Sequence, residues 1–368
     1  MRLARPALLL AVAGVLLPVV SAAAAVPGAS SAAPRKVTTV SDPRITENSG
    51  LAVSPTHADL VWTVNDSGSG PVVYGVSTRT GRTRAALRMA DVDARDMEAL
   101  AAGRDGAGRS WLWIGDIGDN RTVRESVVLR LFREPAQVRS QDVAVTSLRV
   151  RYQHGPADAE TLVWLPDGRL LIVTKAFLSS RVYQVPAVAV RRALAGHDVT
   201  EPVVAQQVGT IPQTLATDGS ALPDGRFVVR GYESATIWSW VDGTLVADAP
   251  VTLPDQPQGE GIGVERSGRT ALVSSEGERE PLYRVTLPAA GASDPTSSTS
   301  PTSPTASPGA SNGTGAPRDE PMGAGAPSDD SGTQWGAPAA FVGGIAAGLL
   351  VVLTLAVRGA RRRSRRTR

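Results

Sequence analysis

The sequence contains no cysteine and has only three histidines in 368 residues. The absence of thiols excludes thiol catalysis, zinc bound through cysteine and iron–sulfur clusters. Residues 35–287 contain no G-x-S-x-G nucleophile motif either, and the histidines are His57, His154 and His197. Hydrolysis by a serine nucleophile therefore finds little support. A folded domain of this chain needs a large core, because disulfides cannot hold it together.

Long apolar runs are confined to the two ends of the chain. Residues 1–25 contain Arg2 and Arg5, then an apolar run and a group of small residues, which is typical of a secretory signal peptide. Residues 337–357 are 21 positions without a charge, enough for a helix to cross a hydrocarbon core of about 30 Å. Seven arginines follow in residues 358–368. The positive-inside rule then predicts a single-pass cell-membrane protein with a cytoplasmic tail and an extracellular body.

Residues 288–336 have few large apolar side chains and consist mainly of Ser, Thr, Pro, Gly and Ala. Such a segment cannot bury enough apolar surface to fold, so we expect a disordered stalk. Residues 35–287 remain as the folded ectodomain. Without the arginines of the signal and the tail, the net charge changes from +3 to −6. An acidic ectodomain argues against nucleic acid as a partner, because phosphate contacts need a basic surface.

The ectodomain has no stretch with the clear 3.6-residue period of an amphipathic helix. Residues 187–197 are its one modest helix candidate and are expected to form a loop or a short turn. Residues 158–175, DAETLVWLPDGRLLIVTK, are typical of two strands. An acid precedes an apolar run, a Pro-Asp-Gly turn follows, and a second apolar run ends on a charge. Asp-Gly between two such runs is a strong hairpin signal.

This two-strand unit recurs five times, at spacings of 43 to 62 residues, and each copy is followed by further predicted strands. In four copies the turn glycine lies eight residues after the start, which places Thr217 rather than Asp218 at the acidic position. The copies begin at Glu47, Glu98, Glu160, Thr217 and Glu260.

Four strands per unit at these spacings predict an all-β fold, a five-bladed β-propeller. The last copy supplies three strands, so we expect residues 37–40 to close the ring as its fourth. A six-bladed ring, with a blade hidden in the longer second and third units, is the alternative. Trp62, Trp113 and Trp164 are expected to be buried in the core.

In a propeller the first strand of each blade lines the channel, so equivalent residues gather at one mouth. Carboxylates gathered there repel one another unless a cation compensates them. Calcium suits such an irregular set of oxygen donors better than zinc, and Asn65 and Asn120 could add donors. The candidate metal ligands are Glu47, Asp66, Glu98, Asp116, Asp119, Glu160, Glu260 and Glu276.

A purely structural ring, in which the acids bond the backbone of the next blade, is the alternative to a metal site. At the end of its second strand the third copy carries Lys175 and Ala176, where the other copies carry an acid. Lys175 and Arg230 are the bases expected near the mouth, and with His154 they are the candidate catalytic residues. The Asp-Gly pairs at Asp105, Asp167 and Asp224 are expected to be turns only.

The segments ENSGLAV, WTVNDSG, DMEALA, IGDIGDN, GPADAETL and QGEGIGV resemble secreted actinobacterial propellers that are grouped with WD40-like and phytase-like, esterase-like propellers. The resemblance covers about residues 37–287. It implies calcium in the channel and hydrolysis of an ester or phosphoester by metal-bound water, with Lys175 and Arg230 clamping an anion.

Together these observations predict a surface-tethered propeller whose acidic, calcium-binding mouth binds an extracellular ligand or protein. A calcium-dependent esterase or phosphoesterase and a structural adaptor of the cell envelope are the alternatives. The expected membrane contact is the one C-terminal helix.

Overall fold

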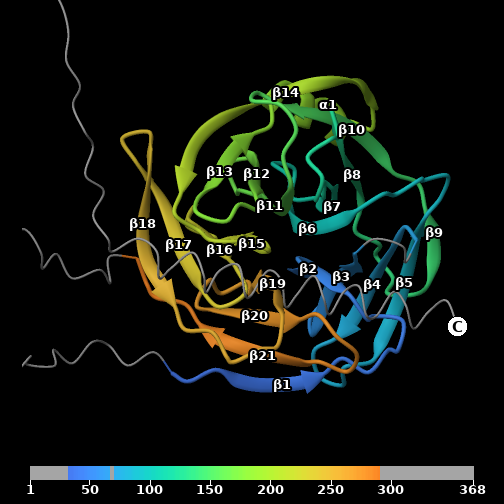
Figure 1. The fold of residues 1–368 in the computed structure, drawn as a ribbon. Coiled ribbons are helices and arrows are strands. Elements are labelled where there is room, and N and C mark those ends of the chain that lie inside the picture. The colour runs from blue at the N-terminus through green and yellow to red at the C-terminus, as the bar shows by residue number, and fades with distance from the viewer. Residues whose placement is uncertain (1–31, 67–69, 291–368) are drawn as a thin grey trace, which may run out of the picture. The chain divides into compact units, whose positions relative to one another are not determined.

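The computed structural model describes residues 32–66 and 70–290, whose regular secondary structure is all β-strand apart from one helix. Figure 1 shows these strands as sheets arranged around a common centre, a propeller-like fold. The predicted signal peptide, the stalk beyond residue 290, the apolar segment 337–357 and the basic tail lie outside the described residues. Within the described part, no helix has the length and apolar character needed to cross a bilayer.

Five antiparallel groups of four strands form the ring, and we number them units 1 to 5. Their first strands contact one another in turn, and the last of them contacts the first, so the ring closes. Unit 1 comprises β2 (Asn48–Val53), β3 (Leu60–Asn65), β4 (Val72–Ser77) and β5 (Thr83–Met89). Unit 2 comprises β6 (Met97–Arg104), β7 (Ser110–Asp116), β8 (Val127–Arg133) and β10 (Thr146–Tyr152).

The remaining units continue in chain order. Unit 3 comprises β11 (Ala159–Trp164), β12 (Leu170–Thr174), β13 (Ser180–Gln184) and β14 (Val199–Ile211). Unit 4 comprises β15 (Asp218–Ala221), β16 (Phe227–Arg230), β17 (Ala235–Val241) and β18 (Thr244–Val251). Unit 5 comprises β19 (Gly259–Val264), β20 (Thr270–Ser275), β21 (Pro281–Thr286) and β1 (Arg35–Thr39).

The N-terminal strand closes the ring, as the sequence predicts. β1 pairs antiparallel with β21, with Arg35 opposite Arg284 and Thr39 opposite Pro281. The first and last strands of the domain therefore share one sheet (Figure 1). Every strand of the ring lies between Arg35 and Thr286, so the domain closes without later residues.

The extra length of units 2 and 3 does not form a sixth blade among the described residues. Part of it is the short edge strand β9 (Gln141–Val143), which pairs parallel with β5. Another part lies in β14, which has 13 residues and pairs parallel with β10, joining units 2 and 3 into one sheet.

The loop expected at residues 187–197 is wrong in part, because Ala187–Leu194 form helix α1. Ala189, Val190 and Ala193 are buried in the same core cluster as residues of β10 and β14, which stabilises so short a helix. Arg191 and Arg192 lie in its last turn, where cations favour the helix dipole.

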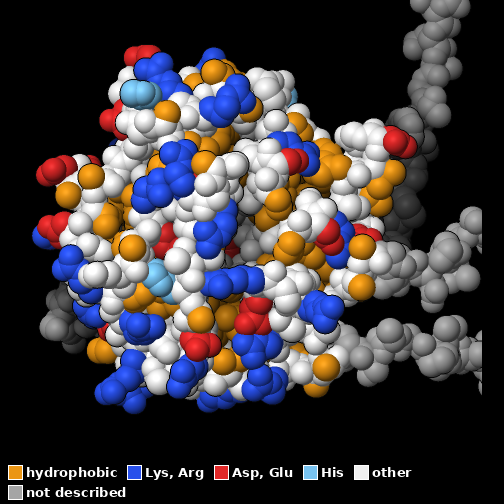
Figure 2. Space-filling model, turned by 180° about the vertical axis from the view of Figure 1, so that it is seen from behind, with side chains coloured by type: hydrophobic (Ala, Val, Ile, Leu, Met, Phe, Trp, Pro, Cys, Tyr) orange, Lys and Arg blue, Asp and Glu red, His pale blue; other side chains and the backbone are white. Residues whose placement is uncertain are grey.

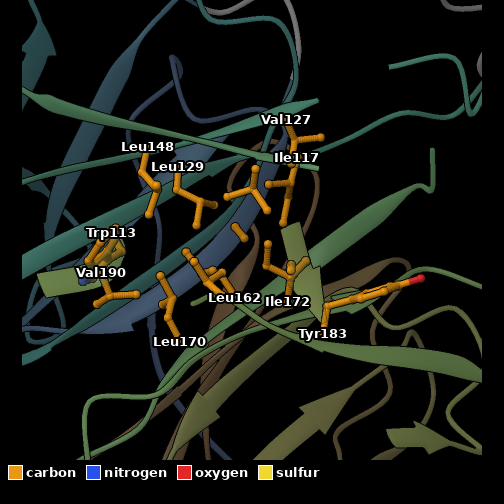
Figure 3. Close-up of a cluster of buried hydrophobic side chains, with 14 of the residues drawn as sticks. Trp113, Ile117, Val127, Leu129, Leu148, Leu162, Leu170, Ile172, Tyr183 and Val190 are labelled. Atoms are coloured by element: carbon orange, nitrogen blue, oxygen red, sulfur yellow. The ribbon is translucent and has the colours of Figure 1, made fainter. Parts of the chain in front are cut away.

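The three tryptophans expected in the core are buried. Trp62 and Trp113 are 0% exposed and Trp164 is 5% exposed. Trp113 meets Trp164 edge-on at 6.1 Å between ring centroids, across units 2 and 3. Figure 3 shows the cluster around Trp113, which includes Leu162 and Leu170 from unit 3. This packing between sheets supplies the core that a domain without disulfides needs.

The Asp-Gly pairs lie in turns, as expected, at the end of the ring where first strands meet second strands. We call this the turn end. Each aspartate forms an ion pair with the arginine that closes its own turn. These pairs are Asp105 with Arg109, Asp167 with Arg169 and Asp224 with Arg226.

Candidate functional site

At the opposite end of the ring, which we call the mouth, first strands begin and second strands end. Cross-strand pairing shows which residues are equivalent. In each unit, one residue of the first strand pairs with the residue two positions before the end of the second strand. These five residues are Leu51, Leu100, Leu162, Ser220 and Ile262. Two residues before them lie Ser49, Glu98, Glu160, Asp218 and Glu260, which we call the inner ring.

This register corrects one expected position. In unit 1 Ser49 lies level with Glu98, and Glu47 lies two residues earlier. Pairing in four first strands skips a residue at a β-bulge, but β15 pairs without one, so unit 4 has one residue fewer there. Asp218 pairs with Arg230 at the end of β16 and is the carboxylate at the start of the first strand of unit 4, with Thr217 immediately before it.

Three carboxylates from units 1 and 2 meet beside the inner ring. Asp66 follows β3, and Asp96 and Glu98 lie at the start of β6. One oxygen from each lies within 4.8 Å of the others. Glu98 is 3% exposed, and Ser49 Oγ donates a hydrogen bond to its Oε2 at 2.8 Å. We call Asp66, Asp96 and Glu98 the carboxylate cluster.

The electrostatics of this cluster favour a bound cation. Burial raises the pKa of Asp96 to about 7, and the hydrogen bond and charge of Asp66 add to the shift. Burial also raises the pKa of Glu98 well above its usual range, and the charges of Glu160, Asp66 and Asp96 raise it further. A cation beside these oxygens would oppose both effects, because it stabilises the ionised carboxylates.

The loop that follows β7 passes close to the cluster. A Cβ atom at Gly118 would lie 2.5 Å from Asp96 Oδ2 and 2.8 Å from Glu98 Cγ. Glycine is therefore the residue that allows this approach. Asn65, next to Asp66, has a buried Oδ1 without a hydrogen-bond partner among the described residues. All donors offered here are oxygens, which is the ligand set that calcium takes.

Lys175 balances the equivalent glutamate of unit 3. Its Nζ lies 2.6 Å from Glu160 Oε1, and the two side chains are 16% and 5% exposed. Nζ also lies 5.1 Å from the centroid of the Tyr232 ring. Burial raises the pKa of Glu160 to about 7 although Lys175 lowers it. Unit 3 thus carries its own cation at the mouth.

Asp116 and Asp119 organise the neighbouring loop. Asp116 Oδ1 lies 3.0 Å from Arg124 Nη2, and its Oδ2 lies 2.8 Å from Arg130 Nη1. Both oxygens also accept backbone N–H groups of Arg95 and Asp96. Asp119 Oδ2 accepts from the backbone N–H of Arg124 at 2.8 Å. Protein donors therefore engage both of these carboxylates.

The two candidate metal ligands of unit 5, Glu260 and Glu276, lie around Gln258. The Gln258 amide donates to Glu260 Oε1 at 3.2 Å and also to Glu276. Burial raises the pKa of Glu260 well above its usual range, and the charge of Glu160 adds to this. Glu276 is partly exposed, and its backbone N–H donates to the carbonyl of Gln258.

Asp218 bonds the backbone of neighbouring units, which is the structural role expected as the alternative to a metal site. It is 0% exposed, and its Oδ2 accepts the backbone N–H of Leu51 at 2.9 Å and of Ile262 at 2.8 Å. It therefore joins unit 4 to units 1 and 5. Burial raises its pKa to about 8.

The expected anion clamp is not formed by Arg230. Arg230 is 0% exposed, and burial lowers its pKa to about 10. Its guanidinium donates to backbone carbonyls of Gly231, Tyr232, Gly261 and Ser274 and to the Gln256 side chain. A side chain held in this way supports the backbone of units 4 and 5 and is closed to an anion.

His154 does not join the inner ring. It is exposed, and its ring centroid lies 6.5 Å from that of Tyr183 in β13. His57 lies in the turn after β2, and one ring nitrogen is 2.7 Å from the carbonyl oxygen of Pro135. Neither histidine is brought to the carboxylates of the mouth.

Two mouth residues, Asp96 and Asp158, are absent from the expected site. Asp158 Oδ1 accepts a hydrogen bond from the backbone N–H of Asp119 at 2.7 Å. The backbone carbonyl of Asp158 accepts a hydrogen bond from the backbone N–H of Lys175. The signal was present in DMEAL and DAETL, where an aspartate stands two residues before the ring glutamate.

No family model matches the chain, and no curated protein matches it. Among solved structures, the apo-form of the soluble aldose sugar dehydrogenase from Escherichia coli matches with 8% identity and a TM-score of 0.40, over 69% of this chain and 99% of that chain. The calcium-binding protein regucalcin from Agrobacterium tumefaciens matches with 13% identity and a TM-score of 0.37, over 69% and 95%. The WD40 repeats of RRP9 match with 9% identity and a TM-score of 0.38, over 70% and 100%.

These neighbours are β-propeller proteins, so the likeness concerns the fold. With identities below 14% and TM-scores of 0.40 or less, it carries no argument about activity. The narrower resemblance to phytase-like propellers stays a prediction, and the candidate site rests on the geometry of the mouth.

Proposed function

We propose that the mouth is a calcium site formed by Asp66, Asp96 and Glu98, and that the protein uses it to bind an extracellular ligand or protein. One observation carries this proposal: three carboxylate oxygens lie within 4.8 Å of one another, while burial and mutual repulsion raise the pKa of two of the groups. Calcium takes six to eight oxygens, so a ligand would complete its coordination.

The cellular setting of this proposal comes from the sequence. The signal peptide predicted at residues 1–25, the stalk predicted at 288–336 and the apolar segment at 337–357 support a ring outside the cell on a single-pass anchor. Calcium sites of extracellular modules work at affinities of roughly 10⁻⁴ to 10⁻³ M. Three carboxylates suit that weak range, because they fill only part of a coordination sphere of six to eight oxygens.

The hydrolase alternative receives less support from the geometry. Arg230 is buried and bound to carbonyls, and Lys175 is paired with Glu160. An anion clamp made from these two side chains would have to break both arrangements. We therefore propose binding rather than hydrolysis as the function of the mouth.

Calorimetric titration of the exported protein with calcium tests the metal site. Wild type should bind calcium and melt at a higher temperature when calcium is present, because binding to the folded state stabilises it. Glu98→Gln should weaken calcium binding at least about tenfold, since it removes one of three charged ligands. Asp142→Asn on β9 is the matched control, because Asp142 is exposed and pairs with Arg88 far from the cluster.

The outcomes separate a calcium site from a purely structural ring. Calcium binding lost in Glu98→Gln and kept in Asp142→Asn supports the site. Wild type that neither binds calcium nor changes its melting temperature overturns it. Ring variants that alter stability alone, with no calcium effect, would favour the structural adaptor.

A further inference from the structure

Charge is separated between the mouth and the rest of the ring. Residues 32–290 contain 28 basic and 30 acidic residues, a net charge of −2. The connections at the mouth hold 7 of the bases and 19 of the acids, whereas the remainder holds 21 bases and 11 acids. Those connections, with the ring residues that border them, are 40–49, 65–71, 90–98, 116–126, 153–160, 175–179, 212–218, 230–234, 252–260 and 276–280.

The chain leaves the ring at the turn end, opposite the mouth. Leu287 follows β21, and its backbone N–H donates to the carbonyl of Arg269, which closes the turn after β19. Arg226 closes the turn after β15, and its Nη2 lies 3.5 Å from the carbonyl oxygen of Pro288. The segment that leads to residues 337–357 therefore starts between two turns of the turn end.

Exposed bases surround this exit. Arg35 and Lys36 are exposed on β1, where Arg35 lies opposite Arg284 of β21. Arg266 and Arg269 are exposed in the turn after β19. Figure 2 shows a face of the molecule on which Lys and Arg side chains are prominent and Asp and Glu side chains are fewer. The part of the ring nearest the exit is thus positive.

We propose that this basic turn end docks onto an anionic phospholipid surface and so holds the acidic mouth away from the membrane. The proposal rests on the anchor in the proposed function, not on calcium. Bases within a Debye length of an anionic bilayer are attracted to it. The acidic mouth is repelled from the same surface, so attraction at one end and repulsion at the other select one orientation.

The bilayer is the occupant because the chain itself brings the ring close to it. The 49 residues between 288 and 336 have a root-mean-square reach of about 40 Å when flexible. A ring held at that distance meets the lipid surface at high effective concentration. Weak attraction per base is then enough for docking.

Co-sedimentation with vesicles tests the docking. The protein is the exported segment 26–336, whose ring closes within residues 35–286, measured in chelator to remove any effect of calcium. Wild type should sediment with vesicles of phosphatidylcholine and phosphatidylglycerol at low salt, and far less at high salt or with phosphatidylcholine alone. Lys36→Glu with Arg269→Glu should reduce this binding about tenfold or more.

The matched control reverses two exposed bases elsewhere. Arg149→Glu with Arg151→Glu on β10 makes the same change in net charge on unit 2. It should reduce binding much less than the pair at the exit. Equal loss of binding in both variants would overturn the docking surface. Wild-type co-sedimentation that does not depend on phosphatidylglycerol would overturn it as well. Failure of the proposed anchor is a separate result, in which the full chain is absent from the membrane fraction.

Discussion

Glu98 and Glu160 occupy equivalent positions of the inner ring but differ in the charged groups that lie beside them. Both are buried at the first strand of their unit, with raised pKa values. Glu160 has Lys175 at 2.6 Å, a cation supplied by its own unit. Glu98 lies with two further carboxylates, Asp66 and Asp96. Unit 3 therefore balances its ring glutamate within the chain, whereas the proposed calcium would balance the carboxylates of units 1 and 2.

Removing the internal cation should give the largest effect. Lys175→Met leaves Glu160 buried without its partner, which should cost about 3 kcal/mol of unfolding free energy at neutral pH. Glu98→Gln should instead stabilise the calcium-free protein, because it removes repulsion within the carboxylate cluster. Urea unfolding in chelator measures both. If the two variants changed stability in the same direction, the contrast between the units would be wrong.

The double variant Lys175→Met with Glu160→Gln controls for lost packing. It removes both charges, so most of the stability lost in Lys175→Met should return. A double variant as unstable as the single one would show that the Lys175 side chain stabilises through packing on Tyr232 and not through charge.

A pH series should give an intermediate effect on the calcium site. The folded pKa of Asp96 is about 7 against an ordinary value of 3.8, so the folded state keeps a proton that the unfolded state releases between these values. Stability without calcium should therefore fall as pH rises from about 4 to 7. Calcium needs the ionised form, so its affinity should fall about tenfold from pH 8 to pH 6. Calorimetry at both pH values checks this, and equal affinities would contradict it.

Asp218 should give the smallest effect, because it is a ring carboxyl that needs no counter-charge. Its pKa of about 8 keeps it neutral at pH 7, and one oxygen holds two backbone N–H groups. Asp218→Asn keeps that acceptor and should change stability by less than about 1 kcal/mol, whereas Asp218→Ala should cost about 2 kcal/mol by leaving both donors unpaired. Thermal melts distinguish them. A severe loss in Asp218→Asn would mean that the charge itself is required.

The fold could be predicted from the sequence because each unit repeats a local signal. The turn glycines, the apolar runs and the missing fourth strand of the last copy led to five units closed by β1. The helix at Ala187–Leu194 lies in the one segment that the sequence marks as a helix candidate, but a loop or short turn was expected there, because its stability comes from buried contacts with β10 and β14 rather than from a strong period. The parallel pairing of β10 with β14 was also missed, since it joins segments of different units.

The site could be predicted only in part. The sequence brought Asp66 and Glu98 to one mouth, but it placed Glu47 in unit 1 where the strand pairing has Ser49. Asp96 was missed although it stands two residues before Glu98. The engagement of Asp116 by Arg124 and Arg130 depends on how a loop folds back, which no spacing along the chain predicts.

The pairing of β1 with β21 has a consequence for biogenesis. During synthesis β1 is made first, and its partner β21 follows about 245 residues later. Contacts of such high sequence separation form slowly, and an unpaired edge strand is prone to aggregate in the meantime. Until β21 is made, the ring remains open and β1 has no strand to pair with. We therefore expect the folding of this protein to depend on a holding chaperone more than that of a domain of the same size with local pairing.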